Sequence, residues 1–240
     1  MALTDLQKER IKKFIPMFRA YLAATDRIDD IQVRQERIDL YSNLLSSEGI
    51  ESMDELSFGK VISSLWAFAM WGNKGYLVEK LIEDNPLDQL KIKLKELLWG
   101  NETLADRYDS FRNNCRGFGP ATISELLAFT HPEICGLWNK IVRDALTILG
   151  FRSTFPIIGM YQINGSQYVE INNLLGEIRQ ELTQYDLGNL DLLGIDYFLY
   201  EVDRVGIEIQ DITGEIAVDQ GIVQIEDFNH NEIIDQLLSI

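Results

Sequence analysis

The chain has 240 residues, of which 46% are hydrophobic and 25% charged, with only 5 Pro and 17 Gly. This composition excludes a disordered or fibrous chain, and the longest apolar runs are too short to cross a membrane. The formal net charge is −16. The N-terminal residues contain no apolar signal core, so we expect a cytoplasmic protein.

The negative charge is concentrated in the last third of the chain. Residues 151–240 contain 16 acidic and 3 basic residues, and no Lys follows Lys140. A surface with this charge repels a phosphate backbone. We therefore expect any local basic face to lie in residues 1–150, and the acidic part to suit a basic protein partner.

The first 150 residues predict one helix after another. The third expected helix follows the start signal Ser52-Met53-Asp54-Glu55, and the fourth begins with Pro86. Apolar residues at helical spacing indicate helices over 6–22, 26–45, 53–71, 86–99 and 103–114.

The character of the chain changes after Gly150. Residues 151–165 have Pro and Gly between β-branched and aromatic residues, which is typical of a loop or a short hairpin. Helices are expected over 167–182 and 190–202. From Arg204 on, acids and glycines separate the apolar residues, which indicates a linker or short strands, with an amphipathic helical pattern over 229–240. We therefore expect a mostly α-helical bundle over residues 1–203 and a small acidic extension over 204–240.

Two cysteines, Cys115 and Cys135, and two histidines, His131 and His230, are too few and too scattered for a zinc or iron–sulfur site. We expect the cysteines to be reduced core residues. The sequence also lacks a GxxxxGK[ST] phosphate loop and a Gly-x-Ser-x-Gly elbow. It therefore predicts neither a metal site nor a cofactor.

The most informative segment is Gly117-Phe118-Gly119-Pro120, which lies between two apolar helical segments. Two glycines one residue apart allow a tight turn, and proline suits the first position of the next helix. The first amides of such a helix lack intrahelical partners and lie at the positive end of the helix dipole, so they can bind a phosphate. The alternative is an ordinary turn between helices.

Residues 108–151 resemble the helix-hairpin-helix motif, and more specifically the helix-hairpin-helix superfamily of base-excision DNA glycosylases. In that family a Gly-hydrophobic-Gly hairpin begins a helix, and a short loop then leads into the next helix, which contains a Val-Arg pair and ends at Leu-Gly. The matching residues here are Gly117 to Gly119, Val142-Arg143 and Leu149-Gly150. The resemblance implies an all-α body that contacts DNA through the hairpin. The order of a helical part and an acidic part is also similar to the N-terminal modules of restriction-type DNA-defence proteins.

Two positions depart from the family pattern. Where the resemblance implies a catalytic Asp, this chain has Asn139, and where some members carry a Schiff-base Lys it has Ala121. A neutral amide can neither stabilise an oxocarbenium ion nor act as a base, and Ala cannot form an imine. The sequence therefore predicts no catalytic residue in this chain.

The residues expected to contact DNA surround the Gly117 segment. Trp66, Trp71, Trp99 and Trp138 are expected chiefly as core residues, and Trp138 is the best candidate among them for stacking on a base. Asn139 is expected chiefly as a helix N-cap, and Glu125 as a buried partner of an arginine, with Arg143 as the candidate. The basic residues form either a rim or ordinary solvated surface. The full set is Arg112, Arg116, Gly117, Phe118, Gly119, Ala121, Thr122, Trp138, Asn139, Lys140 and Arg143.

The sequence thus predicts a non-catalytic DNA-binding module of DNA repair or of defence against foreign DNA. One alternative is an enzyme: either an atypical glycosylase in which Asn139 orients a water molecule, or a nuclease-associated enzyme that is active only as part of a longer chain. The other is an interaction module with a purely structural hairpin, whose acidic part binds a basic protein. Salt-dependent DNA binding separates these hypotheses.

Overall fold

The computed structural model describes residues 2–24 and 28–213, and every regular element in these two ranges is helical. The α-helices are α1 (Asp5–Ala23), α2 (Ile28–Leu44), α3 (Ser47–Glu51), α4 (Glu55–Ser64), α5 (Lys74–Asp84), α6 (Leu87–Trp99), α7 (Leu104–Asn114), α8 (Pro120–Thr130), α9 (Lys140–Ile148), α10 (Gly165–Leu182) and α11 (Leu192–Thr213). Three short 3-10 helices are η2 (Trp66–Phe68), η3 (Pro156–Gly159) and η4 (Thr183–Tyr185). The expected mostly α-helical fold is confirmed.

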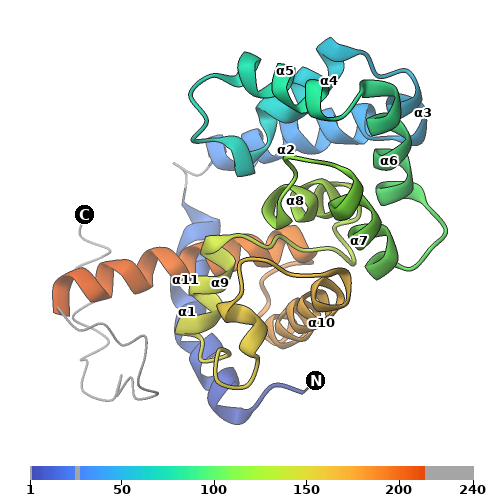
Figure 1. Ribbon diagram of the computed structural model, residues 1–240. Helices are drawn as coiled ribbons and strands as arrows, with labels where there is room; N and C mark the ends of the chain where they lie inside the picture. Colours follow the sequence, from blue (N-terminus) through green and yellow to red (C-terminus); the bar gives the residue numbers. More distant parts are fainter. Residues whose placement is uncertain (1, 25–27, 214–240) are drawn as a thin grey trace.

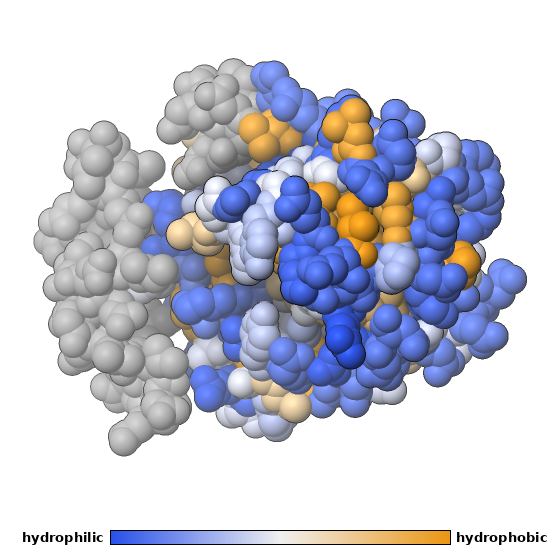
Figure 2. Space-filling view, turned by 45° about the horizontal axis from the view of Figure 1, so that its top comes forward, coloured by the Kyte–Doolittle hydropathy of each residue, from blue (hydrophilic) through white to orange (hydrophobic). Residues whose placement is uncertain are grey.

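Helices α2 to α6 gather on one side of the molecule, and α1, α9, α10 and α11 on the other (Figure 1). Helices α7 and α8 lie between the two groups (Figure 1). One continuous hydrophobic core joins all of these helices. On the face turned forward in Figure 2, hydrophobic residues form small patches in a mainly hydrophilic surface.

Helix α8 is the centre of this arrangement. Every residue from Thr122 to Phe129 is buried, and α2, α6, α7, α11 and η2 pack around the helix. A helix that is apolar on nearly all sides is stable only inside a core. The start of α8 and the turn before it are therefore held in a fixed place.

The helix expected over 53–71 is interrupted. Helix α4 ends at Ser64, Leu65 is extended with ψ 128°, and η2 follows. The reason lies in α8, where the Glu125 carboxylate accepts hydrogen bonds from the backbone amides of Trp66 (2.7 Å) and Ala67 (2.9 Å). A new helical start is therefore favoured at Trp66 over a continuous helix.

Helix α5 was not expected from the sequence. It begins after Asn73, whose side chain accepts a hydrogen bond from the Tyr76 amide. The segment 151–165 is a loop that contains only η3, with no strand.

The expected boundary at residue 204 falls inside a helix. Helix α11 continues to Thr213, and both Val202 and Val205 are buried in the core. Residues 204–213 are therefore helical rather than a linker or strands. The amphipathic pattern over 229–240 lies outside the described residues.

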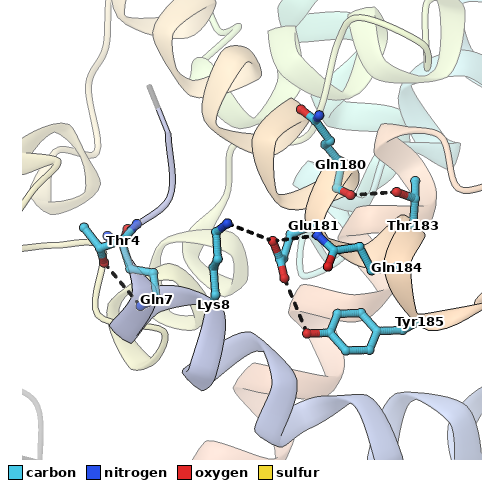
Figure 3. Close-up of polar contacts among 8 residues, drawn as sticks. All are labelled: Thr4, Gln7, Lys8, Gln180, Glu181, Thr183, Gln184 and Tyr185. Carbon is cyan, nitrogen blue, oxygen red and sulfur yellow. Dashed lines mark hydrogen bonds and ion pairs between the residues drawn. The ribbon is translucent and has the colours of Figure 1, made fainter.

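The start of α1 is joined to the end of α10 by polar contacts (Figure 3). Glu181, which is 6% exposed, forms an ion pair with Lys8 at 3.6 Å and accepts hydrogen bonds from Gln184 and Tyr185. These contacts satisfy a carboxylate that the packing of α1 against α10 removes from water. Within residues 2–24 and 28–213, no helix has the length and apolar character that a membrane span requires.

Candidate nucleic-acid interface

The turn of residues 115–119 joins α7 to α8, and its two glycines have different roles. Gly117 has φ +84°, a conformation that residues with a side chain rarely adopt. Gly119 is extended, with φ −86° and ψ 176°, and is the N-cap of α8. A Cβ atom at Gly119 would meet only the Tyr161 hydroxyl, at 3.6 Å. The fold therefore requires glycine at 117 but not at 119.

The turn is fastened to α5 by Asn85, a contact that the sequence analysis missed. The buried Asn85 side chain accepts a hydrogen bond from the Arg116 amide (2.7 Å) and donates one to the Arg116 carbonyl (2.9 Å). Phe118 is 5% exposed and packs edge-on against Phe111. Phe118 is therefore an anchor of the turn, and its ring does not face outward to contact DNA.

The first turn of α8 offers unpaired backbone amides. Pro120 has no amide hydrogen, and the first intrahelical bond runs from the Ile123 amide to the Gly119 carbonyl (3.0 Å). No side chain caps this helix, whereas Thr103 caps α7 and Asn139 caps α9. The amides of Ala121 and Thr122 are thus left for an external acceptor. Thr122 is 3% exposed as a whole residue, so Ala121, which is partly exposed, offers the more accessible of the two amides.

Two arginines from different helices contact the loop 151–164. Arg112, in the last turn of α7, donates hydrogen bonds to the Ile163 carbonyl (2.6 Å) and to the Gln162 side chain (2.9 Å). The Arg143 guanidinium lies 5.7 Å from the centre of the Tyr161 ring. Tyr161 is 54% exposed, and its hydroxyl adjoins Gly119 in the turn.

Among the described residues, no ion pair neutralises the arginines around the turn. In the part of the chain that the structure describes, no carboxylate lies within ion-pair distance of Arg112, Arg116, Arg143 or Arg152. Arg116 is exposed in the turn, and Arg152 packs against Gly159 in the same loop as Tyr161. We call these four arginines, Arg112, Arg116, Arg143 and Arg152, the basic rim. They belong to a chain whose net charge is −16.

Three other residues that the sequence suggested for DNA contact have side chains that are buried or already engaged within the protein. Trp138 is 1% exposed, so its indole belongs to the core and is not available to stack on a base. The Asn139 side chain accepts a hydrogen bond from the Val142 amide at 3.0 Å and caps α9. Lys140 forms an ion pair with Asp144, which raises the pKa of its ammonium group and compensates its charge.

Replacing Asn139 by Ala is expected to lower the free energy of unfolding by about 1 kcal/mol, because α9 loses its side-chain cap. Asn139→Asp keeps the cap and is expected to leave stability nearly unchanged. Urea denaturation of both variants measures the difference. A loss of DNA affinity in Asn139→Ala without any loss of stability would instead make this amide a DNA contact.

Glu125 does not pair with Arg143. Its carboxylate is 1% exposed and lies 3.7 Å from the guanidinium of Arg37 on α2. Burial raises the pKa of Glu125 to about 7, against the lowering effect of the two backbone amides, Arg37 and Lys74. The arginine partner that the sequence indicated is therefore real, but it comes from a different helix.

Asp196 on α11 is a second carboxyl at the same junction, on a partly exposed residue with one buried oxygen. Burial and the nearby Glu125 charge raise its pKa to about 7, and Arg34 opposes this shift. One carboxylate oxygen of Asp196 has no hydrogen-bond partner among the described residues. These perturbed groups face α2, while the side chain of Asn139 is occupied by its own helix. They give no support to an enzyme site at Asn139.

The unfolding free energy is expected to fall as pH rises from about 5 to about 7, by about 2 kcal/mol per pH unit. Both carboxyls have raised pKa values in the folded protein, so it binds more protons than the unfolded chain in this window. Chemical denaturation across pH measures the slope. Asp196→Asn is expected to flatten it and to stabilise the protein at alkaline pH. Stability that increases from pH 5 to 7 would contradict this assignment.

Neither cysteine is a candidate nucleophile. Both are buried free thiols, and burial raises the pKa of Cys115 and of Cys135 to about 11. Across the described ranges, no group of three His, Cys, Asp or Glu side chains is arranged to hold a metal ion. A pocket of about 470 Å³ lies at the N-terminal end of α7, lined in part by Leu104, Ile134 and Asn172, at the opposite end of that helix from the turn.

Comparisons of the chain with protein-family models, with curated proteins and with solved structures give no match.

Proposed function

We propose that this chain is a non-catalytic DNA-binding module, acting in DNA repair or in defence against foreign DNA, that binds phosphates with the backbone amides at the start of α8. The observation that carries the proposal is the basic rim. In an acidic chain, four arginines without carboxylate partners among the described residues lie around a helix start that has no side-chain cap.

The path of the chain supports reading α7, the turn and α8 as a helix-hairpin-helix. Gly117 adopts the left-handed conformation that such a tight turn uses, Phe118 anchors the turn, and Pro120 begins the second helix. This extends the resemblance to the helix-hairpin-helix glycosylases. Ala121 and Asn139 still lack the groups for either glycosylase mechanism, and Asn139 is engaged as an N-cap.

The charges and the amides have separate tasks in this proposal. The helix dipole and the amides of Ala121 and Thr122 form a short-range site for one phosphate oxygen. Arg112, Arg116, Arg143 and Arg152 supply the local positive potential that the net charge of −16 would otherwise oppose. Because screening weakens that opposition, binding is expected at moderate ionic strength as well as at low salt.

Fluorescence anisotropy with labelled duplex and single-stranded DNA over a salt series tests the proposal. Contact with three to five phosphates predicts a log–log slope of about −2 to −4 against salt concentration. No binding to either DNA form at about 50 mM salt would contradict the proposal. Tight binding to a cationic protein under the same conditions would then favour the acidic interaction module.

A further inference from the structure

We propose that an unpaired nucleobase stacks on Tyr161, so that the module prefers single-stranded DNA, or DNA with unpaired nucleotides, to fully paired duplex. The inference rests on the proposed DNA-binding function and names the substrate class of the same site. The first observation is that the Tyr161 side chain is exposed on the surface. Tyr161 is 54% exposed, although it carries one of the larger apolar rings of the chain.

The residues on either side of Tyr161 are anchored to the protein, and they hold the Tyr161 ring at the surface. Arg112 binds both the Gln162 side chain and the Ile163 carbonyl, directly after Tyr161. Ile163 is 1% exposed, and the preceding Met160 amide donates a hydrogen bond to the Ile157 carbonyl at 2.8 Å. A ligand that stacks on a ring held in this way loses little affinity to ordering of the loop.

The surroundings of the ring favour a base with an attached phosphate. The Tyr161 hydroxyl adjoins Gly119, the N-cap whose helix offers the free amides of Ala121 and Thr122. The Arg143 guanidinium lies over one face of the Tyr161 ring, 5.7 Å from its centre, so a base would stack on the other face. The Arg143 Nε atom is buried without a hydrogen-bond partner among the described residues. A phosphate at the amides would therefore bring the neighbouring nucleotide beside an aromatic ring and an uncompensated cation.

A paired duplex cannot use this ring, because the faces of its bases are covered by their neighbours in the stack. Single-strand binding proteins combine a positively charged surface with aromatic side chains on which successive bases stack. Stacking of this kind is tolerant of sequence, since every base has a π-face. The arrangement around Tyr161 thus predicts a preference for DNA structure, with little preference for base sequence.

The test compares binding of Tyr161→Ala to a single-stranded oligonucleotide and to its duplex. Tyr161→Ala is expected to weaken single-strand binding about 5- to 100-fold and duplex binding less than about twofold. Tyr161→Phe keeps the ring and should retain the preference. Tyr161→Leu keeps apolar bulk without a ring and should lose it, which separates stacking from a loosened loop. Tyr76→Ala is the matched control, because Tyr76 is 56% exposed on α5 and should not affect binding.

A 2-aminopurine in the single strand gives a readout specific to stacking. Its fluorescence should be quenched on binding to the parent protein and to Tyr161→Phe, and much less on binding to Tyr161→Ala or Tyr161→Leu. Equal losses on both DNA forms, or no loss on either, would overturn the inference. If the parent binds no DNA at all, the proposed function itself fails. If Gly119→Asp abolishes binding but Tyr161→Ala does not, only the stacking inference fails.

Discussion

Replacing Gly119 by Asp is expected to reduce DNA affinity by about 10- to 100-fold without lowering the stability of the protein. Gly119 is extended, so the fold tolerates a side chain there, and a Cβ atom would meet only the Tyr161 hydroxyl at 3.6 Å. An Asp N-cap accepts hydrogen bonds from the amides at the second and third helical positions. It would therefore occupy the amides of Ala121 and Thr122 and repel a phosphate, while stabilising α8 by a few tenths of a kcal/mol.

Gly72→Asp is the matched control for this variant. Gly72 is exposed, and a Cβ atom there meets nothing within 4 Å, so the same charge is added away from the turn. Anisotropy titrations and thermal melts of both variants give the two readouts. If the turn had only a structural role, Gly119→Asp would not be expected to raise the stability of the protein while lowering its affinity for DNA. If Gly119→Asp bound DNA as tightly as the parent protein, the amides of Ala121 and Thr122 would not be the phosphate site.

Gly117 is less suitable for the same experiment. Its φ of +84° strains any residue with a Cβ atom, and that atom would lie 2.5 Å from Leu81 Cδ2. A substitution there changes the fold of the turn and its contact with α5 together. Loss of binding in such a variant would not distinguish a blocked phosphate site from a displaced turn.

Replacing Glu125 by Ala is expected to lower the free energy of unfolding by about 3–5 kcal/mol. The change leaves the Arg37 guanidinium without its buried carboxylate and removes the acceptor of the Trp66 and Ala67 amides. The two amides then lose their acceptor in a buried site, while Arg37 keeps its hydrogen bond to the Ser64 carbonyl. Urea denaturation at one pH measures the loss.

Glu133→Ala is the matched control for the buried carboxylate. The Glu133 side chain is 77% exposed, and its ion pair with Arg179 at 3.6 Å is a surface contact. Such a pair contributes about 1 kcal/mol or less. If the two variants were equally stable, the carboxylate of Glu125 would not hold α2, α8 and η2 together.

The sequence predicts most of the helices because their apolar residues recur at helical spacing and their caps are local. The N-cap role of Asn139 and the left-handed conformation of Gly117 follow from residues next to them in the chain. The break at Leu65 does not, because the carboxylate that accepts from Trp66 lies 59 residues away in α8. No local pattern near residue 65 contains that information.

The sequence likewise predicts some residues of the candidate site and not others. The arginines of the rim in residues 112–143 could be selected from their position beside the glycine turn. Tyr161 could not, because only the contacts of Arg112 and Arg143 bring its loop against Gly119. Trp138 looks like a stacking residue from its place beside Asn139, yet the packing of α8 and α9 buries it. Whether a side chain can contact DNA depends on its exposure. Exposure is set by how the helices pack, and the spacing of residues in the sequence does not predict it.

The most direct test of the central claim is to follow the backbone amide resonances of Gly117, Phe118, Gly119, Ala121 and Thr122 by NMR during titration with a short oligonucleotide. The account predicts that the largest shift changes occur at Ala121 and Thr122, that they saturate with the same Kd as anisotropy, and that added salt reverses them. Shift changes confined to other helices, with these amides unmoved at saturating DNA, would contradict the proposal that the start of α8 binds the phosphate.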